Sequence, residues 1–227
     1  DMDFKLMQGV TTNVNGNCGS GVIPYSDADI VKWYPNLDGI PKWNSYGEYS
    51  ELVNKSKEIN CEYEICDVLE QDQIDQISNK HADTINGLAY CVGSINLKPL
   101  KITKDTDFIE SFKINTLGAI NVIKSNTESL AKNNGSILLF STIAVQQGFT
   151  NHSVVSSSKG AIEGLTMSLA AEFAPKIRVN CIAPSLTDSK MSQKMVSNEN
   201  IRKAIENMHP IPKIGQGEDF GDLSSFL

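Results

Sequence analysis

From residue 51 onward, apolar strand-like segments alternate with segments in which apolar residues recur at helical spacing. The clearest succession is a strand at 136–140, a helix from about 157 to 173 and a strand at 177–183. Strands that are apolar throughout are typical of parallel sheets, because helices cover both faces of such sheets. The alternation therefore predicts an α/β fold, with a doubly wound parallel sheet and helices on both of its faces.

The same alternation extends in both directions from this unit. The upstream elements are predicted as helices at 51–59, 71–79 and 105–130 and as strands at 61–68 and 83–92. Downstream, residues 219–227 have the composition of a helix start. The last strand that usually completes a sheet of this kind does not follow, so we expect the fold to lack it.

The first 50 residues differ from the rest in composition and in pattern. Trp33 and Trp43, the two tryptophans of the chain, lie there, as do four of its six tyrosines. Asn-Gly and Asp-Gly pairs, which favour turns, divide the segment into short pieces. We therefore expect one domain over residues 1–227, in which 1–50 is atypical or rearranged and 51–227 carries the α/β pattern.

Composition excludes several classes of partner. A net charge of −7 disfavours nucleic acid or an acidic membrane surface. No stretch approaches the roughly 20 apolar residues of a membrane span, and no charged start followed by an apolar run indicates a signal peptide. The five cysteines form no CxxC pair, and the three histidines are scattered, which predicts free thiols and no metal site. Together these observations favour a cytoplasmic protein.

The residues that carry chemistry cluster around the helix at 157–173. The strand at 136–140 ends in the hydroxyl pair Ser141-Thr142, Lys159 stands at the helix, and the next strand ends in Pro184. This order resembles the second half of a short-chain dehydrogenase/reductase. The resemblance covers roughly residues 51–227 and implies a Rossmann-like fold that binds NAD or NADP.

The resemblance also implies roles for the matching catalytic residues. Lys159 matches the active-site lysine, which holds the ribose of the cofactor. Thr142, or the adjacent Ser141, matches the serine that orients a substrate carbonyl. Asn115 matches the helix asparagine that supports a proton-relay water.

The residues that resemble the family's cofactor-binding residues lie at the ends of predicted strands. The resemblance implies that the adenine lies against Asp67 and Val68, the acidic end of the predicted strand at 61–68, and that the nicotinamide lies against Pro184 to Thr187. Cys91 and Gly93 close the strand at 83–92, where the family has Asn-Asn-Ala-Gly. Asp67 is equally consistent with a simple turn or helix-cap residue.

The phosphate-binding loop of the family has no clear counterpart. The nearest candidate contains Gly16, Gly19 and Gly21 and is one residue shorter than the family pattern. Glycines let a backbone approach phosphates at a helix N-terminus, but Pro24 follows too soon for a good helix start. The alternative is an ordinary glycine-rich turn.

The family also expects a tyrosine four residues before the lysine, and this chain has Val155 there. A phenol beside an ammonium has a lowered pKa and can protonate the carbonyl oxygen as the hydride arrives. General acid catalysis is typically worth about 10²–10⁴-fold, so Val155 is expected to cost that factor unless another acid substitutes. Tyr90 and His152 are the nearby titratable candidates.

The sequence is consistent with two functions. The first is a short-chain dehydrogenase/reductase acting with NAD or NADP on a small carbonyl or alcohol. The second is a catalytically silent relative that serves as a binding or oligomer-forming protein. Gly160, Ala161 and Gly164 place small residues along the helix at 157–173, which allows close helix packing. Because the family uses this helix in its dimer interface, we expect a homodimer or homotetramer.

Overall fold

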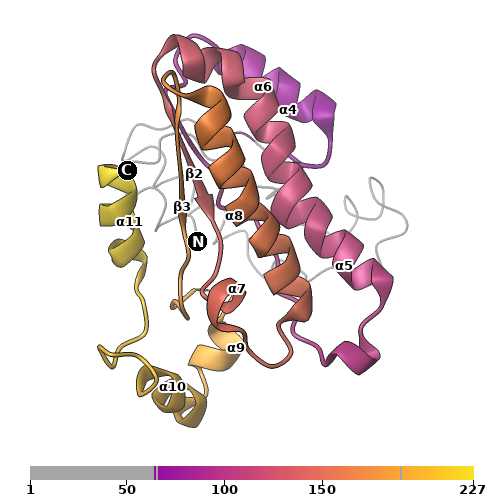
Figure 1. Cartoon of the computed structure of the whole chain (residues 1–227), viewed down its shortest axis with the longest axis vertical. Helices are drawn as coiled ribbons and strands as arrows, with labels where there is room; N and C mark the ends of the chain where they lie inside the picture. The colour runs from indigo at the N-terminus through magenta and orange to yellow at the C-terminus, as the bar shows by residue number, and fades with distance from the viewer. Residues whose placement is uncertain (1–63, 65, 190) are drawn as a thin grey trace, which may run out of the picture.

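Three parallel strands organise the part of the chain that the computed structural model describes, which is residues 64, 66–189 and 191–227 (Figure 1). The strands are β1 (Gly87–Ala89), β2 (Ser136–Phe140) and β3 (Arg178–Ile182), in the order β1-β2-β3. Ser136 is in register with Gly87 on one side and with Arg178 on the other. β2 is therefore the central strand of the three.

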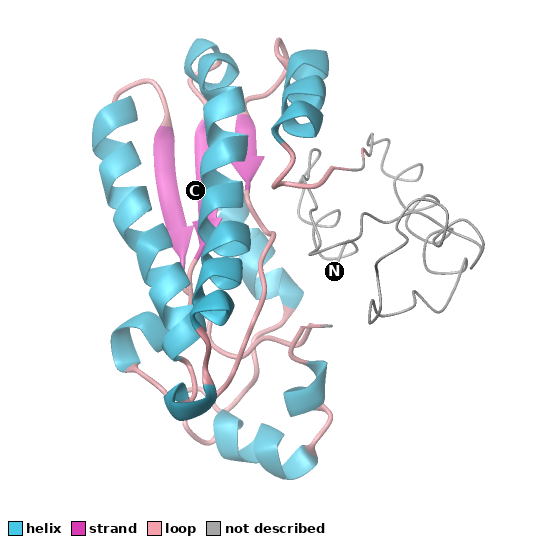
Figure 2. Cartoon of the chain, turned by 90° about the vertical axis from the view of Figure 1, so that its right-hand side faces the viewer, coloured by secondary structure: helices cyan, strands magenta, loops and turns pink. Residues whose placement is uncertain are grey.

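Helices cover both faces of this sheet, as the views in Figures 1 and 2 show. On one face lie α5 (Asp105–Phe112), α6 (Gly118–Lys132) and α8 (Ser153–Phe173), with α4 (Gln71–His81) packed against α6. On the other face lies α11 (Gly217–Phe226). The remaining elements are short: η1 (Leu100–Ile102), η2 (Lys113–Leu117), α7 (Ala144–Gln147), α9 (Gln193–Val196) and α10 (Glu199–Glu206). The prediction of an α/β fold with a parallel sheet is confirmed.

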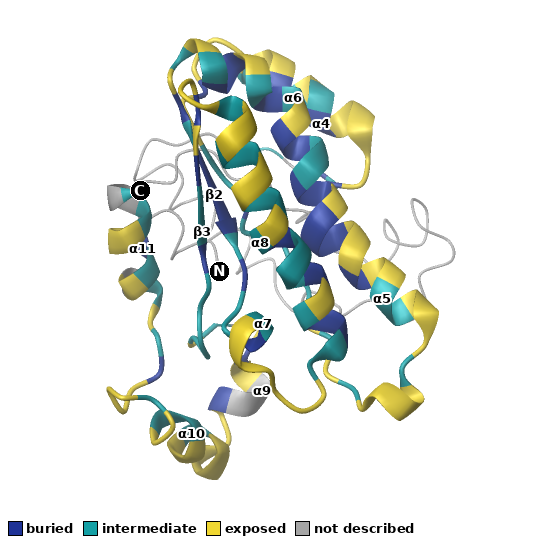
Figure 3. Ribbon diagram, in the orientation of Figure 1, coloured by how far each residue is buried: buried dark blue, intermediate teal, exposed yellow. Residues whose placement is uncertain are grey.

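The apolar residues of β2 form the centre of the core. Ile137 and Leu139 are completely buried, and they belong to one core cluster with Ile123 and Leu130 of α6 and Ile162 of α8. Figure 3 shows the buried parts of β2, α6 and α8 in dark blue. Burying an aliphatic side chain of this size contributes about 1.5–3 kcal/mol relative to exposure. None of the helices in the described ranges is long and apolar enough to span a membrane.

Two predicted strands differ from the structure. Among the described residues, the predicted strand at 83–92 is a strand only over β1. One further backbone bond lies on each side of it: the Ser136 N–H donates to the Asn86 carbonyl over 3.0 Å, and the Tyr90 N–H donates to the Leu138 carbonyl over 2.9 Å. Of the predicted strand at 61–68, residues 64 and 66–68 are described and form no strand. An apolar run marks burial, whereas a strand also needs a partner alongside, and periodicity does not reveal where that partner ends.

Two predicted helices also differ. α8 begins at Ser153 rather than near 157, and its serines are accommodated inside the helix. The Ser157 hydroxyl, for example, donates to the Ser153 carbonyl over 2.7 Å. The helical region predicted at 105–130 is divided by η2, a five-residue π-helical turn. The predicted helix at 51–59 and the segment 1–50 lie outside the described residues.

The structure can be compared with the predictions for the last strand and the last helix of the chain. The helix expected at 219–227 is present as α11. In the described part of the chain no sheet strand follows β3. β3 itself spans 178–182, close to the predicted 177–183.

Candidate active site

The candidate site lies where the carboxyl ends of the three parallel strands meet, the edge at which open α/β sheets bind ligands. Gly93 follows β1, Thr142 follows β2 and Pro184 follows β3. Lys159 reaches this edge from α8, and Asn115 reaches it from η2. The tertiary structure thus brings residues from five separate segments to one place.

The Asn115 side chain fastens the loop after β1 to the helix behind it. Its Oδ1 accepts the Ser94 N–H over 3.2 Å, and its Nδ2 donates to the Ser94 carbonyl over 3.3 Å and to the Ser111 carbonyl over 2.9 Å. Asn115 is completely buried. Its amide is therefore occupied by protein groups, and it acts as a positioning residue for the loop 93–94.

Gly93 allows Asn115 and Lys159 to approach the same strand end. A Cβ atom at this position would lie 2.7 Å from Asn115 Oδ1 and 3.4 Å from Lys159 Nζ. The first distance is too short for any real side chain. The match to the glycine of the family therefore has a physical reason: the residue must leave room for both side chains.

The Lys159 ammonium is buried without a carboxylate partner in the described ranges. Its Nζ donates to the Phe140 carbonyl over 2.8 Å, and burial lowers the pKa of Lys159 from 10.5 to about 8. An ammonium has three donors. Within the described part of the chain two of them have no protein acceptor, so they are available to a hydroxylated ligand.

Ser141 and Thr142 differ in what their hydroxyls do. The Ser141 hydroxyl is buried and donates to Glu163 Oε1 over 2.6 Å. Thr142 Oγ1 accepts the Ala144 N–H over 3.3 Å and keeps its own proton for another acceptor. Of the two predicted residues, Thr142 is therefore the one whose hydroxyl proton has no acceptor in the described part of the chain.

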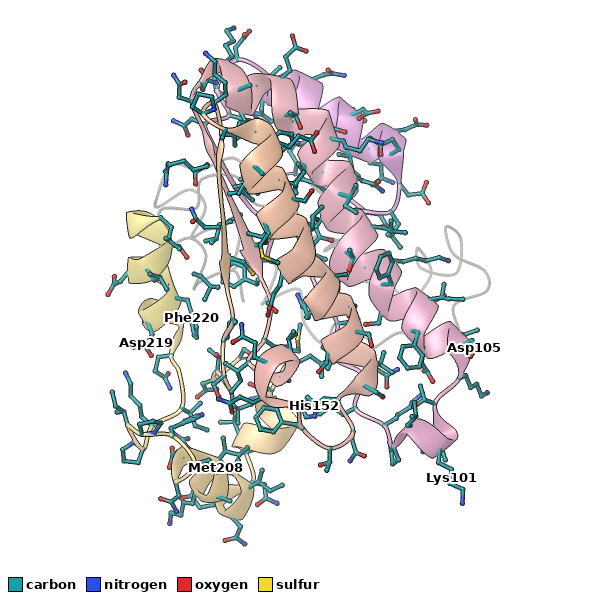
Figure 4. All side chains as sticks on the ribbon, in the orientation of Figure 1. Lys101, Asp105, His152, Met208, Asp219 and Phe220 are labelled. Atoms are coloured by element: carbon teal, nitrogen blue, oxygen red, sulfur yellow. The ribbon has the colours of Figure 1, made fainter. Side chains whose placement is uncertain are left out.

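Val155 and both predicted substitutes for the missing phenol have defined surroundings in the structure. Val155 is 4% exposed within α8. Tyr90 is 3% exposed, and its hydroxyl donates to the Ile114 carbonyl over 2.6 Å. His152 lies just before α8 (Figure 4), where its Nδ1 is 2.7 Å from the Thr150 carbonyl.

The adenine-side residues have structural partners of their own. Asp67 Oδ1 accepts the Leu69 N–H over 2.9 Å, and the Asp67 N–H donates to Gln73 Oε1 over 2.9 Å. These are the bonds of a turn that leads into α4. Val68 is buried in the core and is 1% exposed as a whole residue. Cys91 is half-buried.

The nicotinamide-side segment is fixed by its own hydrogen bonds. The Pro184 carbonyl accepts the Ile143 N–H over 3.1 Å, and the Thr187 hydroxyl donates to the Ser185 carbonyl over 3.1 Å. Gly16, Gly19 and Gly21 lie outside the described residues. No group of three or more possible metal ligands occurs in the part of the chain that is described.

Sequence reasoning did not identify the hydroxyl pair behind the site. Ser111 and Ser158 are buried with their Oγ atoms 2.9 Å apart, and the Thr116 hydroxyl donates to the Ser158 carbonyl over 3.0 Å. The first bond joins α5 to α8, and the second joins η2 to α8. Serines on two helices carry no signal in the sequence that they meet, so only the packing of the helices reveals the pair.

Comparison with known proteins agrees with this arrangement. The family model described as Enoyl-(Acyl carrier protein) reductase matches residues 45–227. Together with the Rossmann-like structural relatives, this shows that the chain belongs to the short-chain dehydrogenase/reductase family.

Several particular relatives are similar over much of the chain. A human protein, dehydrogenase/reductase SDR family member 2, mitochondrial, is 28% identical over 72% of this chain and 60% of its own length. Hydroxynaphthalene reductase arp2 of Aspergillus fumigatus is 35% identical over 60% of this chain and 54% of its own length. The chain thus spans less than two thirds of either relative.

Solved structures show the same fold. The structure of ElxO with NADP bound is 28% identical, with a TM-score of 0.72 over 81% of this chain and 77% of ElxO. A putative gluconate dehydrogenase from Agrobacterium tumefaciens has a TM-score of 0.73 over 81% of this chain and 75% of its own, at 18% identity. The second likeness concerns the fold alone.

Proposed function

We propose that the protein is a nicotinamide-dependent oxidoreductase that acts on a small carbonyl compound or alcohol. The observation that carries the proposal is the Lys159 ammonium, buried beside Gly93 with one protein acceptor and no carboxylate partner among the described residues. Burying such a charge is costly unless a ligand completes its hydrogen bonds. A pair of ribose hydroxyls has the acceptors that this ammonium lacks.

The surrounding residues fit a nicotinamide cofactor. Lys159 would hold the ribose, Asp67 and Val68 would border the adenine, and Pro184 to Thr187 would border the nicotinamide. The cofactor, NAD or NADP, would supply the hydride. Thr142 would donate its free hydroxyl proton to the substrate carbonyl, and Asn115 would keep the loop 93–94 in place. The solved relative with NADP bound supports this choice of cofactor.

The second candidate, a relative that binds without turnover, is favoured by one observation. Val155 fills the position of the family's acid, and the Tyr90 phenol is already bonded to the Ile114 carbonyl. Without a phenol the developing alkoxide has no strong acid beside it, which corresponds to a rate lower by about 10²–10⁴-fold. The two candidates share the cofactor site and differ in measurable turnover.

A calorimetric titration of the full chain with NADH and with NADPH tests the shared part. We expect binding in the micromolar range for at least one of them. Lys159→Met should weaken this binding at least about tenfold, because charged hydrogen bonds are worth about 1.5–3 kcal/mol. Lys124→Met, at an exposed position on α6, is the matched control. Absence of binding at millimolar cofactor would refute the proposal.

We further propose that the whole chain forms one domain and that two copies associate through α5 and α8. These helices pack against each other and leave large apolar side chains exposed. Ile109 on α5 is 52% exposed, and Met167 on α8 is 70% exposed. A second copy that covers them would remove this apolar surface from water.

A further inference from the structure

Beyond the strand ends, a serine and a histidine from distant parts of the chain meet. Ser185 lies in the loop after β3, and His209 follows α10, which lies below that loop in Figure 1. Ser185 Oγ is 2.6 Å from His209 Nε2, and His209 Nδ1 is 2.8 Å from the Lys213 carbonyl oxygen. The oxidoreductase function places Ser185 in the segment that borders the nicotinamide, but it assigns no role to the Ser185 hydroxyl or to His209.

The hydrogen-bond partners fix the direction of proton donation. A carbonyl oxygen can only accept, so the neutral imidazole of His209 must carry its proton on Nδ1, facing Lys213. Nε2 is then the basic nitrogen, and the Ser185 hydroxyl donates to it. A nucleophile bonded to a base, with the base oriented by a third group, is the arrangement that activates serine hydroxyls in acyl transfer.

Donors for a developing oxyanion lie beside the same hydroxyl. The backbone N–H groups of Leu186 and Thr187 have no acceptor in the described part of the chain. The loop is held rigid, because the Gly215 N–H donates to the Leu186 carbonyl over 3.1 Å and the Asp188 N–H donates to the Gly215 carbonyl over 2.9 Å. The N–H of the residue after a nucleophilic serine commonly belongs to an oxyanion hole.

The nucleophile is also accessible. Ser185 and His209 are both half-buried rather than enclosed. Ser185 stands where the family segment Pro-Gly-x-x-Thr has glycine, so the hydroxyl is an addition by this chain to the loop. A glycine at this position would leave His209 Nε2 without the Ser185 hydroxyl.

We propose that Ser185, His209 and the Lys213 carbonyl form a nucleophilic site that accepts a short acyl group from an activated ester. Ser185 Oγ attacks the ester carbonyl carbon while His209 Nε2 takes the hydroxyl proton. The bond from that carbon to the alcohol oxygen breaks, and the proton passes from His209 to the departing alcohol. Water then cleaves the Ser185 ester, with its proton moving through His209 to Oγ, and releases the carboxylic acid.

The test is acylation of the cofactor-free full chain by p-nitrophenyl acetate, followed by mass spectrometry of the intact protein and of its peptides. We expect one acetyl group per chain, located on Ser185. Ser185→Gly, which restores the residue of the family pattern, should abolish this labelling. His209→Gln should slow it by at least about 10²-fold, the usual worth of a general base. Ser189→Ala and His152→Gln are the matched controls and should leave it unchanged.

The same variants separate this proposal from the oxidoreductase function. NADPH titration of His209→Gln should match that of the unchanged protein, because His209 lies outside the segments proposed to hold the cofactor. Acetylation at another residue, equal labelling of Ser185→Gly, an unaffected rate in His209→Gln, or no acetylation at all would overturn the proposal. If Ser185→Gly fails to fold, the acetylated peptide of the unchanged protein decides the matter alone.

Discussion

The phenol of Tyr90 donates to the backbone carbonyl of Ile114 over 2.6 Å and thereby completes the π-helical turn η2. In a regular α-helix that carbonyl would accept the N–H of Gly118, but here the Gly118 N–H bonds to Lys113 one residue earlier. The displaced carbonyl is buried and needs a donor. Tyr90 is therefore a structural residue, placed to stabilise the turn that carries Asn115.

Tyr90→Phe should destabilise the protein by about 1–3 kcal/mol, because it leaves a buried carbonyl without its donor. The free energy of unfolding in urea measures this loss. Ser157→Ala removes an exposed hydroxyl that bonds within α8, and it should change the stability by less than about 0.5 kcal/mol. Equal stabilities of Tyr90→Phe and the unchanged protein would show that η2 does not depend on the phenol.

Gly118→Ala should also destabilise, although alanine is the better helix former. A Cβ at Gly118 would clash with the Tyr90 hydroxyl oxygen and lie 2.9 Å from Val68 Cγ2, and overpacking of this kind costs about 1–3 kcal/mol. Gly164→Ala is the matched control, because nothing lies within 4 Å of its Cβ position. That variant should gain roughly 0.5–1 kcal/mol. Thermal unfolding of both variants, compared at one protein concentration, distinguishes these signs.

Val155→Tyr should raise carbonyl reduction by about 10²–10⁴-fold, since it restores an acid beside the Lys159 ammonium. The measurement is the rate of NADPH or NADH oxidation with a panel of small ketones. Val155→Phe adds the same ring without the hydroxyl and should give no increase. If both variants react alike, the gain comes from the ring and the proposed acid role is wrong.

Stability should depend on pH through Lys159. Its pKa is about 8 in the folded chain against 10.5 ordinarily, so the unfolded chain binds more protons between these values. The stability contributed at this site therefore rises as the pH goes from about 8 to about 10.5, by on the order of 3 kcal/mol. The Lys159→Met variant has no amine at this site, so its stability should not show this rise with pH.

Urea unfolding at several pH values in that window tests this dependence. The advantage of Lys159→Met over the unchanged protein should shrink steadily as the pH increases. Lys124→Met, which removes an exposed positive charge on α6, shows how much of any change is unspecific. A constant difference between Lys159→Met and the unchanged protein would contradict burial of a charged amine.

Met167→Glu should turn the proposed dimer into a monomer, because it places a charge on the exposed apolar surface of α8. Light scattering at micromolar concentration gives the mass. Ile211→Glu is the control, since Ile211 is 69% exposed but lies away from α5 and α8. A monomeric unchanged protein would refute the proposed association directly.

The sequence predicted those features that depend on local pattern. Apolar runs gave the position of β2 within the chain, and helical spacing gave α4 and α6, because burial of one face imposes its period on the sequence. The residues of the candidate site, such as Lys159 and Asn115, could be named from their order along the chain. Their roles in catalysis and cofactor binding stay predictions until the experiments above are done.

Other features were not accessible from pattern, because their partners lie far away along the chain. The π turn at η2 depends on Tyr90, which belongs to another segment. Which of Ser141 and Thr142 has a hydroxyl available to a ligand depends on Glu163, because Glu163 accepts the hydrogen bond from the Ser141 hydroxyl. A side-chain hydroxyl has no preferred partner until packing supplies one.

The sequence by itself determined the α/β class, the order of its elements and the replacement of the expected tyrosine by Val155. The tertiary structure decided that Tyr90 supports η2, that Asp67 caps a turn and that Ser185 faces His209. The physical reason is the range of the interactions. The hydrophobic period arises within one helix or strand and is therefore visible in the sequence of that element. The hydrogen-bond partner of a polar side chain is fixed only when distant elements pack together.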